Sequence, residues 1–158
     1  MKVVFLDYNY VLDTSVNIDE VDYLNLQRLK RIIKETGEKI VLTSSIKNSY
    51  CITGNCITGI YNRQFLKLKD RLISEGLEIL DITKHLETRK LEVLDYLKTH
   101  NNIKNYCIID DDYKMDSLKD HLVKLPNQME EGQMGLDDYH TDMAIKILKR
   151  NDKVKKLK

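Results

Sequence analysis

The chain has 158 residues, the size of one ordinary domain, of which 42% are hydrophobic and 32% are charged. Its 26 basic and 25 acidic residues give a formal net charge of +1. That balance argues against a protein with a strong nucleic-acid-coating surface, because such domains carry a marked basic excess. No apolar run is long enough to cross a bilayer and the first residues lack a signal-peptide pattern, so we expect a cytoplasmic protein with no membrane partner.

Short apolar runs alternate with amphipathic stretches along the chain. In chain order they predict a strand at 3–6, a helix at 19–36, a strand at 39–42, a helix at 64–73, a strand at 77–82, a helix at 88–99, a strand at 106–109, a further strand at 121–125 and a helix at 138–150. This alternation is typical of an α/β, Rossmann-like three-layer sandwich with a mostly parallel sheet. We expect residues 1–150 to form a single domain and residues 151–158 a solvated basic tail.

Leucine spacing marks the helix predicted at 88–99. Leu91, Leu94 and Leu97 recur there at helical intervals. In the last predicted helix, Ala144 and Leu148 are expected to face inward.

Polar clusters follow three of the predicted strands at the point where each strand ends. Asp7 follows the first strand, Thr43 and Ser44 follow the second, and Asp110 and Asp111 follow the fourth. Because the carboxyl ends of parallel strands meet at one edge of a sheet, we expect these side chains to lie together. A carboxylate there can attack phosphorus, and grouped carboxylates with oxygen ligands suit Mg²⁺.

Two basic residues and three cysteines complete the candidate chemistry. Arg89 and Lys90 could stabilise the negative charge of a transferring phosphoryl group, or they could be an ordinary charged first turn of a helix. Cys51, Cys56 and Cys107 form an odd set, and a zinc site would need two further ligands at metal-like spacing. We therefore interpret the cysteines as ordinary reduced thiols.

Four segments resemble, in order, the four motifs of the haloacid dehalogenase (HAD) superfamily. They are FLDYNYVLDT at 5–14, IVLTSS at 40–45, the pair Arg89 and Lys90, and CIIDDD at 107–112. The resemblance extends over about residues 2–150, and it is greatest to the small HAD phosphatase-like domain also found fused to RNA-repair proteins. Gly135 and Leu136 resemble a later Gly-Leu pair of that domain.

The resemblance implies a role for each motif residue. It makes Asp7 the nucleophile and a metal ligand, and Asn9 the counterpart of the general acid/base whose backbone carbonyl also binds Mg²⁺. It makes Thr43, or Ser44 in an alternate register, a ligand of the phosphate, and Arg89 or Lys90 the stabilising cation. Asp111 and Asp110 become the acidic metal ligands. The implied activity is a magnesium-dependent hydrolysis of a phosphomonoester on a small molecule or a macromolecule end, such as a nucleotide or a nucleic-acid end. The short connections imply no large cap domain.

Position 9 departs from the family pattern, which has Asp there. An amide neither donates a proton to a leaving oxygen nor takes one from water, and such proton transfer contributes about a hundred- to ten-thousandfold in rate. Tyr10 also stands where relatives often have Gly. The alternative is therefore a catalytically impaired HAD-like domain that binds a phosphorylated ligand or protein partner.

Overall fold

The computed structural model describes residues 1–9, 11–14, 20–43, 60–111, 114–126 and 134–150. In chain order its elements are β1 (Lys2–Leu6), α1 (Tyr23–Thr36), β2 (Lys39–Leu42), α2 (Ile60–Ser74), β3 (Ile79–Ile82), α3 (Arg89–Thr99), β4 (Asn105–Asp110), the 3₁₀ helix η2 (Asp116–His121), β5 (Leu122–Lys124) and α4 (Asp138–Leu148). Ser44 and the basic tail lie outside these described residues. No helix within them is both long and apolar enough to cross a membrane.

The strands form one five-stranded sheet in the order β3-β2-β1-β4-β5, with every neighbouring pair parallel. Strand β1 lies at the centre, and its residues from Val3 to Leu6 are buried completely. A strand covered on both faces needs apolar side chains at every position, which explains the continuous run that predicts it. The predicted α/β architecture with a mostly parallel sheet is confirmed.

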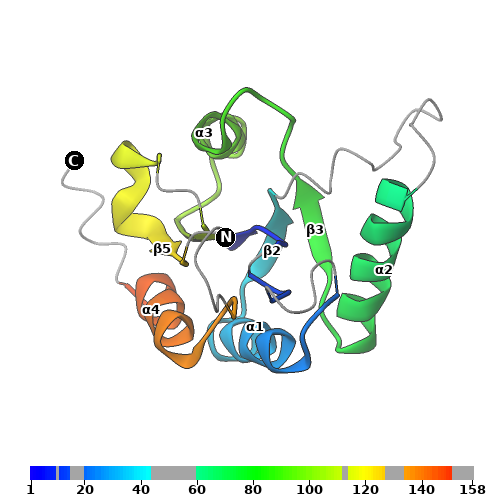
Figure 1. Cartoon of the computed structure of the whole chain (residues 1–158). Coiled ribbons are helices and arrows are strands. Elements are labelled where there is room, and N and C mark those ends of the chain that lie inside the picture. Colours follow the sequence, from blue (N-terminus) through cyan, green and yellow to red (C-terminus); the bar gives the residue numbers. More distant parts are fainter. Residues whose placement is uncertain (10, 15–19, 44–59, 112–113, 127–133, 151–158) are drawn as a thin grey trace.

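Helices cover both faces of the sheet, as Figure 1 shows with α3 on one side and α1 and α4 on the other. Val4 and Leu6 of β1 pack with α1, α2 and α4, whereas Val3 and Phe5 pack with α3 and η2. This division follows from the alternation of side chains along a strand. Every helix and strand of the described residues belongs to these three layers, so none of them forms a separate cap.

Most predicted helices and strands are present, but their first or last residues differ from the prediction. Helix α1 begins after Asp22, whose side chain accepts a hydrogen bond from the backbone of Asn25 as an N-cap, and not at residue 19. The predicted strand at 77–82 is shorter, because the backbone N–H of Leu77 donates to the carbonyl of Leu72 and closes the turn at the end of α2. Helix η2 was not predicted, and it shortens the expected fifth strand to β5.

Helix α3 buries a different face from the one that its leucines mark. Leu91 and Leu94 are 44% and 37% exposed, whereas Glu92, Val93 and Tyr96 are buried. The buried residues lie at i+3, i+4 and i+7 from position 89, so they share one side of the helix. Leu97 is partly buried and packs with Val93 and Tyr96, so two of the three leucines lie outside the buried face.

A close approach joins the segment after β1 to the turn before α4. The backbone N–H of Leu136 donates to the carbonyl of Val11 at 2.8 Å. Gly135 has φ of +74°, and a Cβ there would lie 2.6 Å from the backbone oxygens of Asp13 and Val11 and from Nδ2 of Asn25. Only glycine fits this contact without moving one of the two segments.

We expect Gly135→Ala to lower the free energy of unfolding by about 2–4 kcal/mol, through left-handed strain and overpacking together. Gly37→Ala is the matched control, because Gly37 has φ of 70° but open space around its Cβ position. The control should lose about 1 kcal/mol. Urea unfolding of both variants measures the difference, and equal losses would contradict the close approach.

Candidate active site

The register of the sheet aligns the carboxyl ends of β1, β2 and β4. The backbone N–H of Asp7 donates to the carbonyl of Ile109 at 3.1 Å, and that of Thr43 donates to the carbonyl of Leu6 at 2.9 Å. Asp7, Thr43 and Asp110 therefore begin at the same height on adjacent strands. The strand pairing alone brings together three residues that are far apart in the sequence.

Arg89, the first residue of α3, points its guanidinium between these strand ends. Its Nε lies 3.0 Å from Oδ2 of Asp110, and its Nη2 lies 3.7 Å from Oδ1 of Asp7. The side chain is only 15% exposed. Thr88 caps the helix by accepting a hydrogen bond from the backbone of Leu91 at 3.1 Å, which fixes where the first turn begins. A planar guanidinium can contact two carboxylates at once, and an ammonium does so less well.

Glu92 and Thr83 form a second group behind Arg89, and sequence reasoning missed both. Oε1 of Glu92 lies 3.6 Å from Nη1 of Arg89, and its Oε2 accepts a hydrogen bond from the hydroxyl of Thr83 at 3.4 Å. Both side chains are buried. The available signal was an acid three residues after an arginine at a helix start, where the two share a face.

Three carboxylates converge beside Arg89. One oxygen from each of Asp7, Asp110 and Asp111 lies within 4.8 Å of the other two. Asp7 is 6% exposed and Asp110 is 1% exposed. Glu92 adds a fourth acidic side chain beside Arg89. Oxygen ligands of this kind could hold a hard divalent cation.

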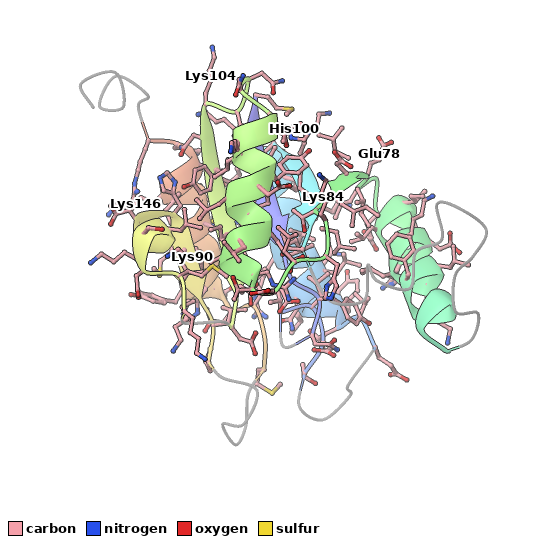
Figure 2. The ribbon with its side chains drawn as sticks, turned by 90° about the horizontal axis from the view of Figure 1, so that it is seen from above. Glu78, Lys84, Lys90, His100, Lys104 and Lys146 are labelled. Atoms are coloured by element: carbon pink, nitrogen blue, oxygen red, sulfur yellow. The ribbon has the colours of Figure 1, made fainter. Side chains whose placement is uncertain are left out.

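Three predicted residues remain, namely Thr43, Lys90 and Ser44. Thr43 is completely buried at the end of β2. Lys90, labelled near the start of α3 in Figure 2, forms no ion pair with Asp7 or Asp110 within the described part of the chain, so Arg89 is the member of the basic pair at the carboxylates. Ser44 lies outside the described residues. Asp116, a further acid near the fourth motif, is exposed on η2.

Asn9 lies in the turn that follows Asp7. Its Nδ2 donates a hydrogen bond of 2.8 Å to Oδ2 of Asp13, which is completely buried. The turn is closed by backbone hydrogen bonds from Val11 and Leu12 to the carbonyl of Tyr8. Position 9 therefore has a defined side-chain orientation.

The described cysteine is not part of this group. Cys107 is completely buried within β4, and burial raises the pKa of its thiol. A thiol that stays protonated is a poor metal ligand and nucleophile. Cys51 and Cys56 lie outside the described residues.

We expect Arg89→Met to lower the free energy of unfolding in metal-free buffer by about 3–5 kcal/mol, because it removes the cation from between buried carboxylates. Arg31→Met is the matched control. Arg31 pairs with Glu35 and Asp142 on the surface with 45% of its side chain exposed, and its loss should have little effect. Urea unfolding compares the two variants, and equal losses would show that Arg89 has no special role in stabilising the strand ends.

Comparison with known proteins agrees with this arrangement. No curated protein and no solved structure matches the chain. Residues 3–140 match the family described as the HAD domain in Swiss Army Knife RNA repair proteins. The match extends from β1 into α4 and so includes every element that contributes to the carboxylate group. The HAD resemblance of the four motifs is thereby confirmed, and the chain belongs to this family of HAD domains.

Proposed function

We propose that the chain is a magnesium-dependent phosphohydrolase in which Asp7 is the nucleophile. The observation that carries the proposal is the convergence of Asp7, Asp110 and Asp111 within 4.8 Å of one another, with Arg89 in contact with the first two. Membership of a HAD family supports a phosphatase-like activity in general. The identities of the nucleophile, the metal and the substrate go beyond what family membership supports, and they are proposed here.

In the first step, an oxygen of Asp7 attacks phosphorus, and the bond to the leaving oxygen breaks as the aspartyl-phosphate forms. In the second step, water attacks the same phosphorus and the carboxylate of Asp7 is released. Arg89 stabilises the negative charge that Asp7 and the phosphoryl oxygens share. Thr43, at the neighbouring strand end, would donate a hydrogen bond to a phosphoryl oxygen.

The donor set fits Mg²⁺, which prefers oxygen ligands and keeps several waters. Asp7, Asp110 and Asp111 would hold the ion, together with the backbone carbonyl of Asn9. When bound, it would neutralise charge on the phosphoryl oxygens.

We propose a phosphomonoester or nucleotide phosphate as substrate, carried by a small molecule or by a nucleic-acid end. The family description, which places such domains in RNA repair proteins, supports a nucleic-acid end. The net charge of +1 favours recognition of a single end over coating of a long strand.

The second candidate is a domain that binds a phosphorylated ligand or protein with little turnover. The observation that favours it is the amide of Asn9, which is held by Asp13 and cannot transfer a proton.

We expect Mg²⁺ to raise the melting temperature by several degrees, because a ligand that binds the folded state stabilises it by mass action, and each kcal/mol corresponds to about 2–4 °C in a domain of this size. Asp111→Asn should abolish most of the shift. Asp70→Asn, which removes a carboxylate from the exposed surface of α2, should keep it. Thermal unfolding with and without Mg²⁺ measures the response, and an unchanged shift in Asp111→Asn would exclude Asp111 as a ligand.

We expect hydrolysis of p-nitrophenyl phosphate in Mg²⁺ to fall at least a thousandfold in Asp7→Asn, because the amide is no nucleophile. The release of p-nitrophenolate measures the rate, and circular dichroism checks that the variant is folded. Equal rates in both proteins would refute the proposed nucleophile. Tight binding of phosphate without turnover in the unmodified protein would favour the second candidate.

A further inference from the structure

The orientation of the Asn9 amide bears on which substrates the proposed site can use. Nδ2 of Asn9 donates a 2.8 Å hydrogen bond to Oδ2 of Asp13, so the NH₂ end of the amide is the end in contact with this carboxyl group. The NH₂ group of Asn9 therefore faces Asp13. The other end of the amide is a carbonyl oxygen, which accepts hydrogen bonds and carries no proton.

The surroundings of Asp13 keep this orientation fixed. Nδ2 of Asn25 lies 3.4 Å from the carbonyl oxygen of Asp13 and donates to that of Met134 at 2.9 Å. Gly135 packs against the same backbone oxygen of Asp13. Three segments of the chain therefore fix the backbone of Asp13, and its carboxylate is completely buried beside Asn9.

We propose that the site is selective for phosphoryl groups on weakly basic leaving groups, and specifically for phosphoanhydrides such as the terminal phosphate of a nucleoside triphosphate or of a 5′-triphosphate nucleic-acid end. The inference rests on the function proposed above and narrows its substrate class. It also gives Asp13 a positioning role, since Asp13 holds the amide of Asn9.

The expected selectivity for leaving groups follows from the first step, in which Asp7 attacks phosphorus. The bond from Asp7 to phosphorus forms, the bond from phosphorus to the leaving oxygen breaks, and the electron pair departs on that oxygen without a proton from position 9. A phosphate leaving group is stable as such an anion. An alkoxide, as released from a sugar phosphate or a monophosphate end, is strongly basic and needs a proton as it leaves.

The second step has a related consequence. Water must lose a proton as it attacks the aspartyl-phosphate, and Asn9 cannot take it. The proton passes to the phosphate product or to bulk water, so this step is slow. We therefore expect the phosphoenzyme to accumulate during turnover of an anhydride.

The test compares kcat/KM in Mg²⁺ for four substrates in the unmodified chain. They are adenosine triphosphate, an RNA oligonucleotide with a 5′-triphosphate, p-nitrophenyl phosphate and the same oligonucleotide with a 5′-monophosphate. We expect the two anhydrides and the aryl ester to exceed the monophosphate at least a hundredfold. The ratio between the two anhydrides distinguishes a free nucleotide from a nucleic-acid end as the source of the phosphoryl group.

Two variants then restore a proton-transferring group at position 9. Asn9→Asp should raise the rate on the monophosphate oligonucleotide about a hundred- to ten-thousandfold and the rates on the anhydrides less than tenfold. Asn9→Asp places two carboxyl groups in contact. The double variant Asn9→Asp with Asp13→Asn is therefore its matched control. The exchange keeps one carboxylate and one amide in the same contact, and it should show the same selective gain.

The outcomes separate this inference from the function on which it rests. If turnover depends on Asp7 but the monophosphate oligonucleotide reacts as fast as the anhydrides, or if both variants accelerate all substrates equally, the leaving-group inference is wrong and the phosphohydrolase stands. If no substrate shows turnover that depends on Asp7, both are wrong. Acid quenching with γ-labelled triphosphate gives a separate readout, because the unmodified chain should retain hydroxylamine-sensitive label and Asp7→Asn should retain none.

Discussion

The contact of the Arg89 guanidinium with Asp7 and Asp110 is the interaction on which the geometry of the site depends. It joins the first turn of α3 to the ends of two adjacent strands. The guanidinium is mostly buried and faces the strand ends. Glu92, Val93 and Tyr96 share its side of α3 and are buried with it. The ion pairs of Arg89 and the apolar packing of Val93 and Tyr96 therefore favour the same orientation of the helix.

Several acidic side chains lie close together around Arg89. Asp7, Asp110 and Asp111 have oxygens within 4.8 Å of one another, and Glu92 also contacts Arg89. Carboxylates this close repel one another, and an ion of the opposite charge stabilises them. Clusters of this kind are typical of functional sites.

The strands were predictable because each is a short apolar run, and three of these runs end at a polar cluster. The same logic grouped Asp7, Thr43 and Asp110, since parallel strands place their carboxyl ends together. The catalytic and binding roles of these residues stay predictions. Periodicity failed where a polar interaction competed with it. In α3 the leucine stripe at positions 91 and 94 is exposed, because the face that starts at Arg89 is the one required at the site.

Glu92 illustrates a further limit of sequence reasoning. In the sequence it is one acid among 25 acidic residues, and its burial depends on the rotation of α3 about an interaction formed with distant strands. Asp13 is a similar case, because its importance follows from contacts with Asn9, Asn25 and Gly135. Asp13 lies within the first motif of the chain, and Glu92 lies three residues after Arg89 of the third. Neither could be recognised as a partner of its motif until the fold had brought the other contacts together.

The hydrogen bond from Leu136 to Val11 has a consequence for synthesis on the ribosome. Asp7 and Asn9 are synthesised well before position 136. The turn that follows them has its full set of neighbours only after position 136 has also emerged. Helices α1 to α3 and the five strands precede that position in the chain and can associate before then. The turn after Asp7 therefore reaches its final conformation only after the segment before α4 has been made.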